Sequence, residues 1–261
     1  MVTLWNALID LLPGNWELFR EWPYWRFLLE GLWLSARIAI YSIVLSLLIG
    51  VSMSVLRLAP SRPLRWAATT YIESMRATPV LLLLFFVFFG ASRFPTGWAM
   101  NVPIANLFVD ENNGDLTPMA SAVIALTLYN SAVVAEIMRA GILSISKGII
   151  EASRCLGLSY LQSMRFVAVP MALRRMAPYL VSQLITLYKD TSLASVIGIL
   201  ELLRRGKILY ETPTYLNPTI EVLLVVSLMY FIPCYALSLV AQRLEQSPDV
   251  RATRRAAAGG P

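Results

Sequence analysis

The chain has 261 residues, of which 57% are hydrophobic and only 15% charged, so its composition is that of a polytopic membrane protein. It carries a net charge of +6 but no histidine, which excludes a Ser/His/Asp triad. Its two cysteines, Cys155 and Cys234, have no second thiol at ligand spacing, so neither a zinc site nor a disulfide framework is indicated. No G-x-x-x-x-G-K-[ST] run is present, which excludes that route to nucleotide binding.

Residues 1–30 carry several acidic residues and no basic leader, so a cleavable signal peptide is not expected. They are rich in aromatic residues, namely Trp5, Trp16, Trp22, Tyr24 and Trp25. We expect an external segment lying at the membrane interface, although a loosely ordered aromatic tail explains this composition equally well.

Five apolar stretches are long enough to cross the hydrocarbon core, which needs about 20 residues. They cover residues 31–58, 65–91, 118–144, 178–200 and 219–244, and Thr78-Pro79 interrupts the second. The sequence therefore predicts an all-α polytopic membrane protein with five transmembrane helices in one domain, residues 31–244.

Basic residues near the ends of these stretches predict the orientation, because cytoplasmic loops carry an excess of Lys and Arg. One side holds most of them: Arg57, Arg62, Arg65, Arg139, Lys147, Arg154, Arg165, Arg174, Arg175, Arg243, Arg251, Arg254 and Arg255. On the other side, basic residues are offset by acidic ones. We expect the N-terminus outside, the C-terminus in the cytoplasm, and residues 245–261 to form a flexible cytoplasmic tail.

The cytoplasmic connection at about residues 145–170 has the pattern of two short helices joined by Gly157. Residues 149–156 form about two turns, with Glu151 in the first turn, where the helix dipole favours a carboxylate. Gly157 supplies the left-handed residue that ends this helix. Ser159-Tyr160-Leu161-Gln162 matches a capping box that starts a second helix, which we expect Pro170 to end.

Ala152 and Ser153 present small side chains in the first of these helices, so another surface could approach its backbone closely. Local physical chemistry supports two interpretations equally. The connection either docks on a partner or packs only against its own bundle.

Ionisable residues inside a span are costly and therefore functional candidates. Glu73 with Arg76, and Glu136 with Arg139, are spaced i,i+3 on their helices, and structural ion pairing is favoured over substrate contact for both pairs. Thr78-Pro79 can expose a backbone carbonyl to a cavity.

Four successive polar residues, Lys189-Asp190-Thr191-Ser192, lie within the fourth stretch. On a regular helix these four side chains would point in different directions, so some of them would face lipid, which is unfavourable for polar groups. They therefore indicate a helix break that lines a polar pathway. A hydrogen-bonded contact between helices is the alternative.

The helix–glycine–helix connection resembles the EAA coupling loop of ABC importer permeases, in which E-A-A precedes a glycine and a later hydrophobic-Pro pair. Here the pattern reads Glu151-Ala152-Ser153, Gly157 and Val169-Pro170. Three further blocks, at residues 75–79, 135–142 and 189–193, are similar to those of the polar amino-acid branch of the binding-protein-dependent permease family, which includes histidine, glutamine and glutamate permeases. The resemblance covers about residues 31–243, and Ser153 departs from it by replacing the second alanine.

The resemblance implies a type I ABC importer permease that conducts a polar amino acid, with glutamate, glutamine or aspartate favoured, through the plasma (inner) membrane of a bacterium. It implies no catalytic residue, metal or cofactor in this chain, because a partner ATPase dimer binds ATP. A second permease subunit and an external amino-acid-binding protein are the other implied partners. An ion-coupled secondary transporter that acts alone is the alternative.

Candidate residues fall into two sites, the first assigned by the resemblance and the second by the polar and charged residues within the spans. The ATPase-coupling residues would be Glu151, Ala152, Ser153, Gly157 and Leu158. The substrate-pathway residues would be Arg76, Thr78, Glu136, Lys189, Asp190, Thr191 and Ser192.

Overall fold

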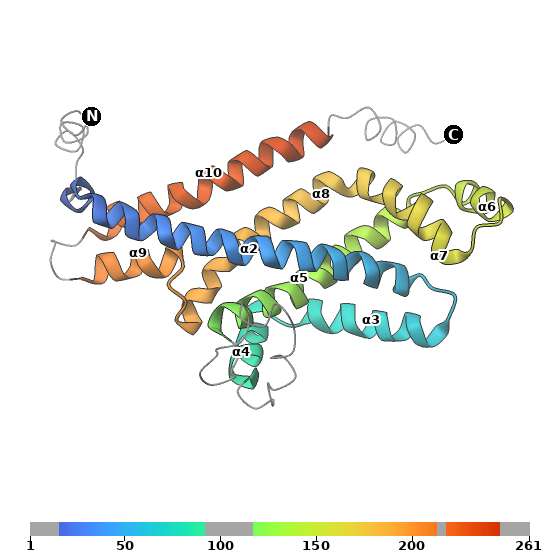
Figure 1. Ribbon diagram of the computed structural model, residues 1–261, viewed down its shortest axis with the longest axis horizontal. Coiled ribbons are helices and arrows are strands. Elements are labelled where there is room, and N and C mark those ends of the chain that lie inside the picture. Colours follow the sequence, from blue (N-terminus) through green and yellow to red (C-terminus); the bar gives the residue numbers. More distant parts are fainter. Residues whose placement is uncertain (1–15, 92–116, 213–217, 246–261) are drawn as a thin grey trace. The chain divides into compact units, whose positions relative to one another are not determined.

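The computed structural model describes residues 16–91, 117–212 and 218–245, and every regular element in these ranges is a helix (Figure 1). The prediction of an all-α protein is therefore confirmed. The elements are η1 (Glu17–Arg20), α2 (Trp22–Arg57), α3 (Arg62–Ala77), α4 (Val80–Ala91), α5 (Pro118–Leu143), α6 (Lys147–Cys155), α7 (Tyr160–Ser163), η4 (Met164–Ala168), α8 (Val169–Asp190), η5 (Thr191–Ile197), α9 (Leu202–Glu211) and α10 (Thr219–Glu245). The expected C-terminal tail beyond residue 245 and the first half of the expected N-terminal segment lie outside the described residues.

Three of these helices, α2, α5 and α10, are long and apolar enough to cross a membrane. Helices α3 and α4 pass the same test together but are bent by 105° at Thr78-Pro79, where Thr78 has an extended backbone (ψ 128°). This bend confirms the predicted interruption, because proline disfavours a helical residue before it.

The fourth predicted span does not meet this test. Its residues form the C-terminal part of α8 and the 3₁₀ segment η5, and α8 also carries Arg174, Arg175 and Lys189. The described ranges therefore contain three candidate spans, or four if the bent pair counts as one, where five were predicted.

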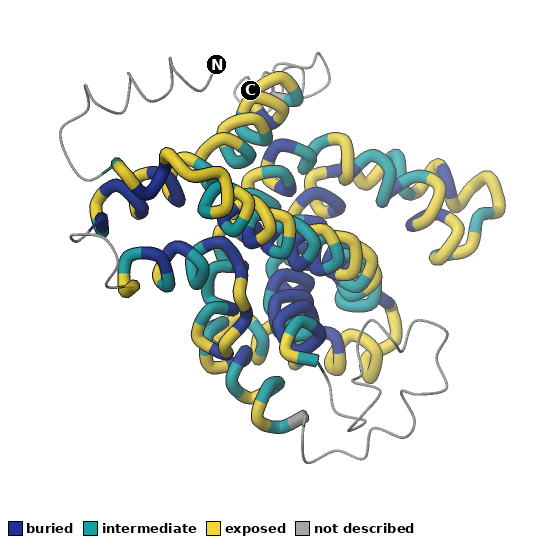
Figure 2. The backbone as a smooth tube through the Cα atoms, turned by 60° about the vertical axis from the view of Figure 1, so that its left-hand side comes forward, coloured by how far each residue is buried: buried dark blue, intermediate teal, exposed yellow. Residues whose placement is uncertain are grey.

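The chain divides into two compact units. The first unit comprises Met1–Ile40, Phe85–Ala122 and Tyr188–Tyr235, and the second comprises Tyr41–Leu84, Val123–Leu187 and Ala236–Pro261. Within both units, buried and exposed residues alternate along the helices (Figure 2).

The core of the first unit forms where η1, α2, α9 and α10 meet. Its buried members are Leu18, Phe19, Leu28, Leu202, Leu209, Val222, Val225 and Val226. Two glycines allow α9 to approach its neighbours: a Cβ on Gly31 would lie 3.0 Å from Leu202 Cα, and one on Gly206 would lie 2.7 Å from Val226 Cγ2. Side chains at these two positions would push α9 away from α2 and α10.

The core of the second unit joins the C-terminal half of α5 to η4 and α8. Its buried members are Val134, Met138, Ile142, Ile145, Met164, Ala168, Ala172 and Leu180. Gly141 permits the closest approach in this core, because a Cβ there would lie 2.5 Å from Met176 Cγ and 3.2 Å from Ala172 Cβ. The segments that precede and follow α6 and α7 in the chain are thus held by one apolar core.

The helix that starts at Ser159 does not end at Pro170, contrary to the sequence prediction. It continues from α7 through the π-helical turn η4 into α8, which ends at Asp190. Proline lacks an N–H group and crowds the carbonyl four residues earlier, so it normally interrupts an α-helix. A π-helical turn pairs residues five apart instead, and this wider turn precedes Pro170 and lets the helix continue.

Candidate functional site

The predicted helix–glycine–helix connection is present, and we call residues 147–163 (α6, the Gly157 corner and α7) the elbow. Helix α6 ends as expected at Gly157, whose φ is +86°. The Gly157 N–H donates to Arg154 O (2.9 Å) and the Leu158 N–H to Ser153 O (3.3 Å). These two bonds form a Schellman motif, which satisfies carbonyls that the helix end would otherwise leave without partners.

The second arm of the elbow begins with the predicted capping box at Ser159. The Gln162 N–H donates to Ser159 Oγ (3.4 Å), and the Ser159 N–H donates to Gln162 Oε1 (2.8 Å). The two arms are therefore each terminated by local hydrogen bonds on either side of the corner. One detail was wrong: α6 starts at Lys147, which puts Glu151 in the second turn rather than the first.

The surface of the elbow carries most of the predicted coupling residues. Glu151, Ala152 and Gly157 are exposed and Leu158 is partly exposed, whereas Ser153 is buried. Sequence reasoning missed Leu156, which is 83% exposed and lies one turn after Ala152 on the same helix face. An exposed leucine at the tip of a short helix is a candidate contact for another protein.

The elbow is tied to the rest of the second unit at both ends. The Tyr160 hydroxyl donates to Val55 O near the end of α2 (3.0 Å), and burial raises the pKa of Tyr160, so this donor stays protonated at neutral pH. On the entry side, Arg175 Nη1 of α8 donates to Ser144 O (2.7 Å), just after the end of α5. A displacement of the elbow is thus resisted by α2, α5 and α8.

A chain of four charged side chains links α2, α3 and α5 in the second unit. Arg57 binds Glu73 (2.7 Å) and Glu136 (2.8 Å), and Glu136 also accepts from Arg139 Nε (3.0 Å). The predicted pairing of Glu136 with Arg139 is confirmed. The structure pairs Glu73 with Arg57, a partner that i,i+3 spacing could not reveal.

This chain bears on two of the predicted pathway residues. Glu136 is engaged by two guanidinium groups, while Arg76 is exposed on α3. A third predicted pathway residue, Thr78, caps α3 and donates its hydroxyl to Ser74 O in the last turn of that helix (2.9 Å). All three residues lie in the second unit.

The other predicted pathway residues, 189–192, lie in the first unit, where the expected helix break is present. The α-helix ends at Asp190 and continues as the 3₁₀ segment η5. Thr191, which is buried, donates to Tyr188 O (2.7 Å), and Ser192 donates to Lys189 O (2.8 Å). The two hydroxyls therefore satisfy carbonyls at the change of helix type.

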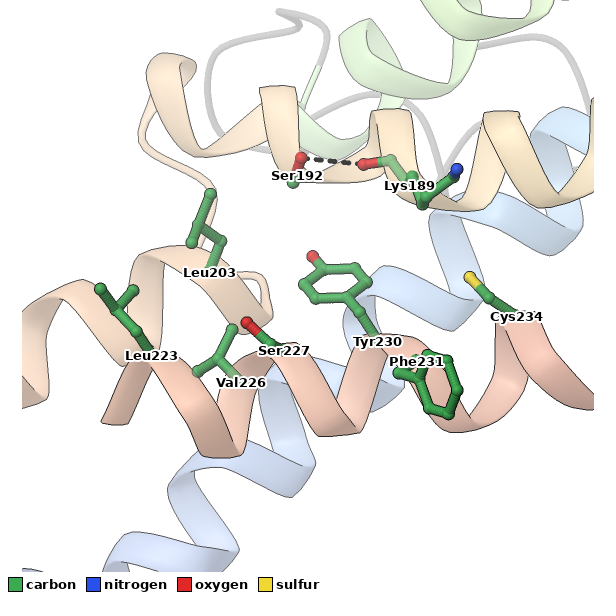
Figure 3. A pocket seen from close by; sticks show the side chains of 9 residues that line it. All are labelled: Lys189, Ser192, Leu203, Leu223, Val226, Ser227, Tyr230, Phe231 and Cys234. Carbon is green, nitrogen blue, oxygen red and sulfur yellow. Dashed lines mark hydrogen bonds between the residues drawn. The ribbon is translucent and has the colours of Figure 1, made fainter. Parts of the chain in front are cut away.

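A cavity of about 480 Å³ adjoins this break, within the first unit (Figure 3). Its wall is formed by Lys189, Ser192, Leu203, Leu223, Val226, Ser227, Tyr230, Phe231 and Cys234. Most of the wall is apolar, with one amine and a few hydroxyl groups among its polar atoms. Of the predicted residues, Lys189 and Ser192 line this cavity, and Asp190 and Thr191 do not.

The wall residue Tyr230 is held by a buried carboxylate, that of Glu201. Glu201 is fully buried and accepts hydrogen bonds from Tyr230 (2.7 Å), from the Leu203 and Arg204 N–H groups (2.9 and 2.7 Å) and weakly from Ser35 (3.5 Å). The two N–H groups belong to the start of α9, where the helix dipole also favours a negative charge. Glu201 thus joins α2, α9 and α10.

These features define a class, the all-α transmembrane subunit of a transporter, with an anchored elbow and a polar break beside a cavity. The chain belongs to the family described as binding-protein-dependent transport system inner membrane component, which it matches over residues 38–248. Members of this family are the membrane-embedded permease subunits of ABC importers, and ATP hydrolysis belongs to a separate ATPase subunit. This family membership also makes the chain an inner-membrane protein.

Individual relatives agree with this assignment. The chain is 39% identical over 219 residues to the probable glutamine ABC transporter permease protein GlnP of Bacillus subtilis (strain 168), covering 84% of this chain and 92% of that protein. It is 32% identical over 242 residues to the glutamate transport system permease protein GluD of Corynebacterium glutamicum, covering 92% and 81%. A chain of the crystal structure of an amino acid ABC transporter with histidines superposes with a TM-score of 0.65 and 28% identity, covering 85% of this chain and 95% of that one.

Proposed function

We propose that this chain forms the transmembrane pathway of an ATP-driven importer of a polar amino acid and receives its energy through the elbow. The observation that supports the coupling role is the construction of the elbow. A short helix, capped at its corner and exposed at Leu156, is anchored to α2 through Tyr160 and to α8 through continuous helix. A partner that moves the tip therefore moves structured helix rather than a loose loop.

The docking surface in this proposal consists of Glu151, Ala152, Leu156, Gly157 and Leu158. Ala152 and Gly157 leave the backbone accessible, Leu156 and Leu158 supply apolar area, and Glu151 offers a carboxylate to a donor across the interface. Ser153, assigned to this surface from the sequence, is buried and does not contribute to it in this proposal. The partner is an ATPase dimer on the cytoplasmic side, where the Lys- and Arg-rich loops are expected.

The substrate in this proposal is a polar amino acid, with glutamate, glutamine or aspartate favoured. The relatives support a polar amino acid as the class, since they are named for glutamine, glutamate, arginine and L-cystine. A zwitterion needs donors for its carboxylate and acceptors for its amine. The cavity wall offers the Lys189 amine and the Ser192 and Ser227 hydroxyls, which can bind a carboxylate and accept from an amine.

The remaining features of the importer follow from the same proposal. A second permease subunit completes the pathway, and an external binding protein delivers the amino acid. The N-terminus lies outside with residues 1–30 at the interface, residues 31–244 form the permease domain, and residues 245–261 form the cytoplasmic tail. Arg76, Thr78 and Glu136 belong to the pathway in the second unit.

The test is to co-purify the chain with its partners, reconstitute the complex in liposomes, and measure ATP hydrolysis and uptake with each amino acid and the binding protein. We expect a polar amino acid to stimulate both. No stimulation by any amino acid would overturn the substrate proposal. Uptake by this chain alone, driven by an ion gradient and indifferent to ATP, would instead identify a secondary transporter.

A further inference from the structure

The two arms of the elbow meet at a pair of buried serine hydroxyls. Ser153 of α6 is 4% exposed and Ser163 at the end of α7 is fully buried. Their oxygen atoms lie 2.9 Å apart, with Ser153 Oγ donating, although the two residues are ten positions apart in the sequence. Ser153 Oγ also lies 2.7 Å from Ile150 O of its own helix, so its single proton is shared between the two arms.

Ser153 also contributes its backbone to the same junction. Its carbonyl oxygen accepts the Leu158 N–H in the motif that ends α6. One residue therefore uses its backbone to close the corner and its side chain to bond the second arm. An alanine at this position would have no hydroxyl with which to make the second of these contacts.

The corner itself offers no steric restraint. Gly157 has no side chain, and a Cβ built there would have no atom within 4 Å. Glycine also adopts many backbone conformations at little cost, so a corner made of it is a natural pivot. Pivoting of α6 is then opposed by the packing of Ile149 and Ile150 against the core of the second unit and by bonds between the two arms.

We propose that Ser153 and Ser163 form a hydrogen-bonded brace that makes the two arms of the elbow move as one body. Ser153 is a positioning residue in this view: it does not touch the ATPase, and it transmits the motion of the exposed tip to η4 and α8. The inference rests on the proposed coupling role of the elbow. It explains why a serine at an otherwise small-residue position is buried while its neighbours Ala152 and Glu151 are exposed.

The first experiment measures the number of amino acids transported per ATP hydrolysed by the complete reconstituted transporter. We expect Ser153→Ala to fold, because alanine removes only the hydroxyl and is a strong helix former. The variant should lower this ratio by up to about tenfold, which is the effect that losing one neutral buried hydrogen bond has on the balance between braced and pivoted elbows. Ser163→Ala should have the same effect. The double variant should be no worse than either single variant, because both remove one interaction.

Ser146→Ala is the matched control. Ser146 is an exposed serine at the start of α6 whose side chain makes no capping hydrogen bond. Its ratio should equal that of the parent. A ratio unchanged by Ser153→Ala and Ser163→Ala, or effects of these two changes that simply add, would overturn the brace.

The second experiment replaces the brace by a reversible covalent bond. Cysteines at positions 153 and 163 are introduced into a Cys155→Ser/Cys234→Ser parent, which serves as the reference and removes competing thiols. Because the two oxygens are 2.9 Å apart, the sulfurs should reach disulfide distance, about 2.0 Å, with little movement. We expect the oxidised protein to transport as many molecules per ATP as the reference, and the reduced protein to show the deficit of Ser153→Ala.

Two outcomes separate this inference from the proposed function. If oxidation abolishes transport and reduction restores it, the arms must move apart during the cycle and the brace is wrong. If Glu151→Lys and Gly157→Val transport normally, the elbow does not couple to the ATPase at all and the proposed function fails first.

Discussion

Two glycines of the elbow provide a matched test of why the corner is built as it is. A Cβ at Gly148 or at Gly157 would meet no atom within 4 Å, so an alanine at either position creates no clash. They differ in backbone conformation: Gly157 has φ +86°, while Gly148 lies within α6 and has no such positive φ. In the isolated chain, any difference in local stability between the two alanine variants therefore measures backbone conformation alone.

The two alanine substitutions are expected to change the stability of the elbow in opposite directions. An L-residue in the left-handed region costs roughly 1–2 kcal/mol, so Gly157→Ala should destabilise the cap by that amount, or by a factor of about 5–30 in its population. Gly148→Ala should stabilise α6 by about 0.5–1 kcal/mol, because glycine inside a helix costs about that much relative to alanine. Gly157→Val should be worse than Gly157→Ala, because a β-branched residue is strained further at positive φ.

Hydrogen exchange of the peptides covering residues 147–163 is the direct assay. The Gly157 and Leu158 amides make the two bonds of the cap, so their exchange should accelerate about 5- to 30-fold in Gly157→Ala and should not accelerate in Gly148→Ala. Uptake per ATP should fall most in the variant whose cap is most destabilised, so it should be lower for Gly157→Val than for Gly157→Ala. Equal exchange in the two alanine variants would show that the positive φ does not hold the corner and would refute the reasoning.

Three further predictions concern the interior of each unit. Tyr230→Phe should lower the free energy of unfolding by about 2 kcal/mol, since it removes a hydrogen bond to the buried Glu201 carboxylate. Tyr235→Phe, at an exposed position, should change the free energy of unfolding by less than about 0.5 kcal/mol. Thermal unfolding in detergent measures both, and equal behaviour of the two variants would contradict the prediction. Arg57→Met should lower the free energy of unfolding more than Glu73→Gln, because the Glu73 carboxylate is mostly exposed and its ion pair is weak in water. The same unfolding experiment would contradict this prediction if the order of the two variants were reversed. Burial raises the pKa of Tyr160 above its ordinary 10.0. The protonated hydroxyl therefore contributes its full stability below about pH 10, and this contribution is lost as the pH rises through the pKa of the folded state. Tyr160→Phe should remove this loss of stability at alkaline pH, which is measured as the free energy of unfolding against pH.

Local signals in the sequence were sufficient to predict the elbow. The glycine that ends α6 and the Ser159-Gln162 capping box act through neighbouring residues only, and both are present as expected. The break at Asp190 was also predictable, since a run of four polar residues is incompatible with one helix face in an apolar span. Pro170 was misread because the π-helical turn that accommodates it leaves no mark in the residue pattern.

The features that were missed depend on contacts between distant segments. Glu73 pairs with Arg57 across two helices, and no spacing rule could prefer that partner to Arg76. Glu201 follows an apolar stretch and looks like a charge at its outer end, yet Ser35 and Tyr230 from two other helices enclose it. Ser153 was expected on the surface, and its burial depends on where α7 returns.

The π-helical turn at Met164–Ala168 also determines the direction in which the elbow points. A π-turn holds about one residue more than an α-turn, and one residue corresponds to about 100° of rotation around an α-helix. The turn therefore acts as an angular spacer between the elbow and α8. Deleting a single residue within it, with Pro170 replaced by alanine so that an α-turn is tolerated, would restore a regular helix and swing the Leu156 tip about 100° around the α8 axis, with every hydrogen bond inside the elbow intact.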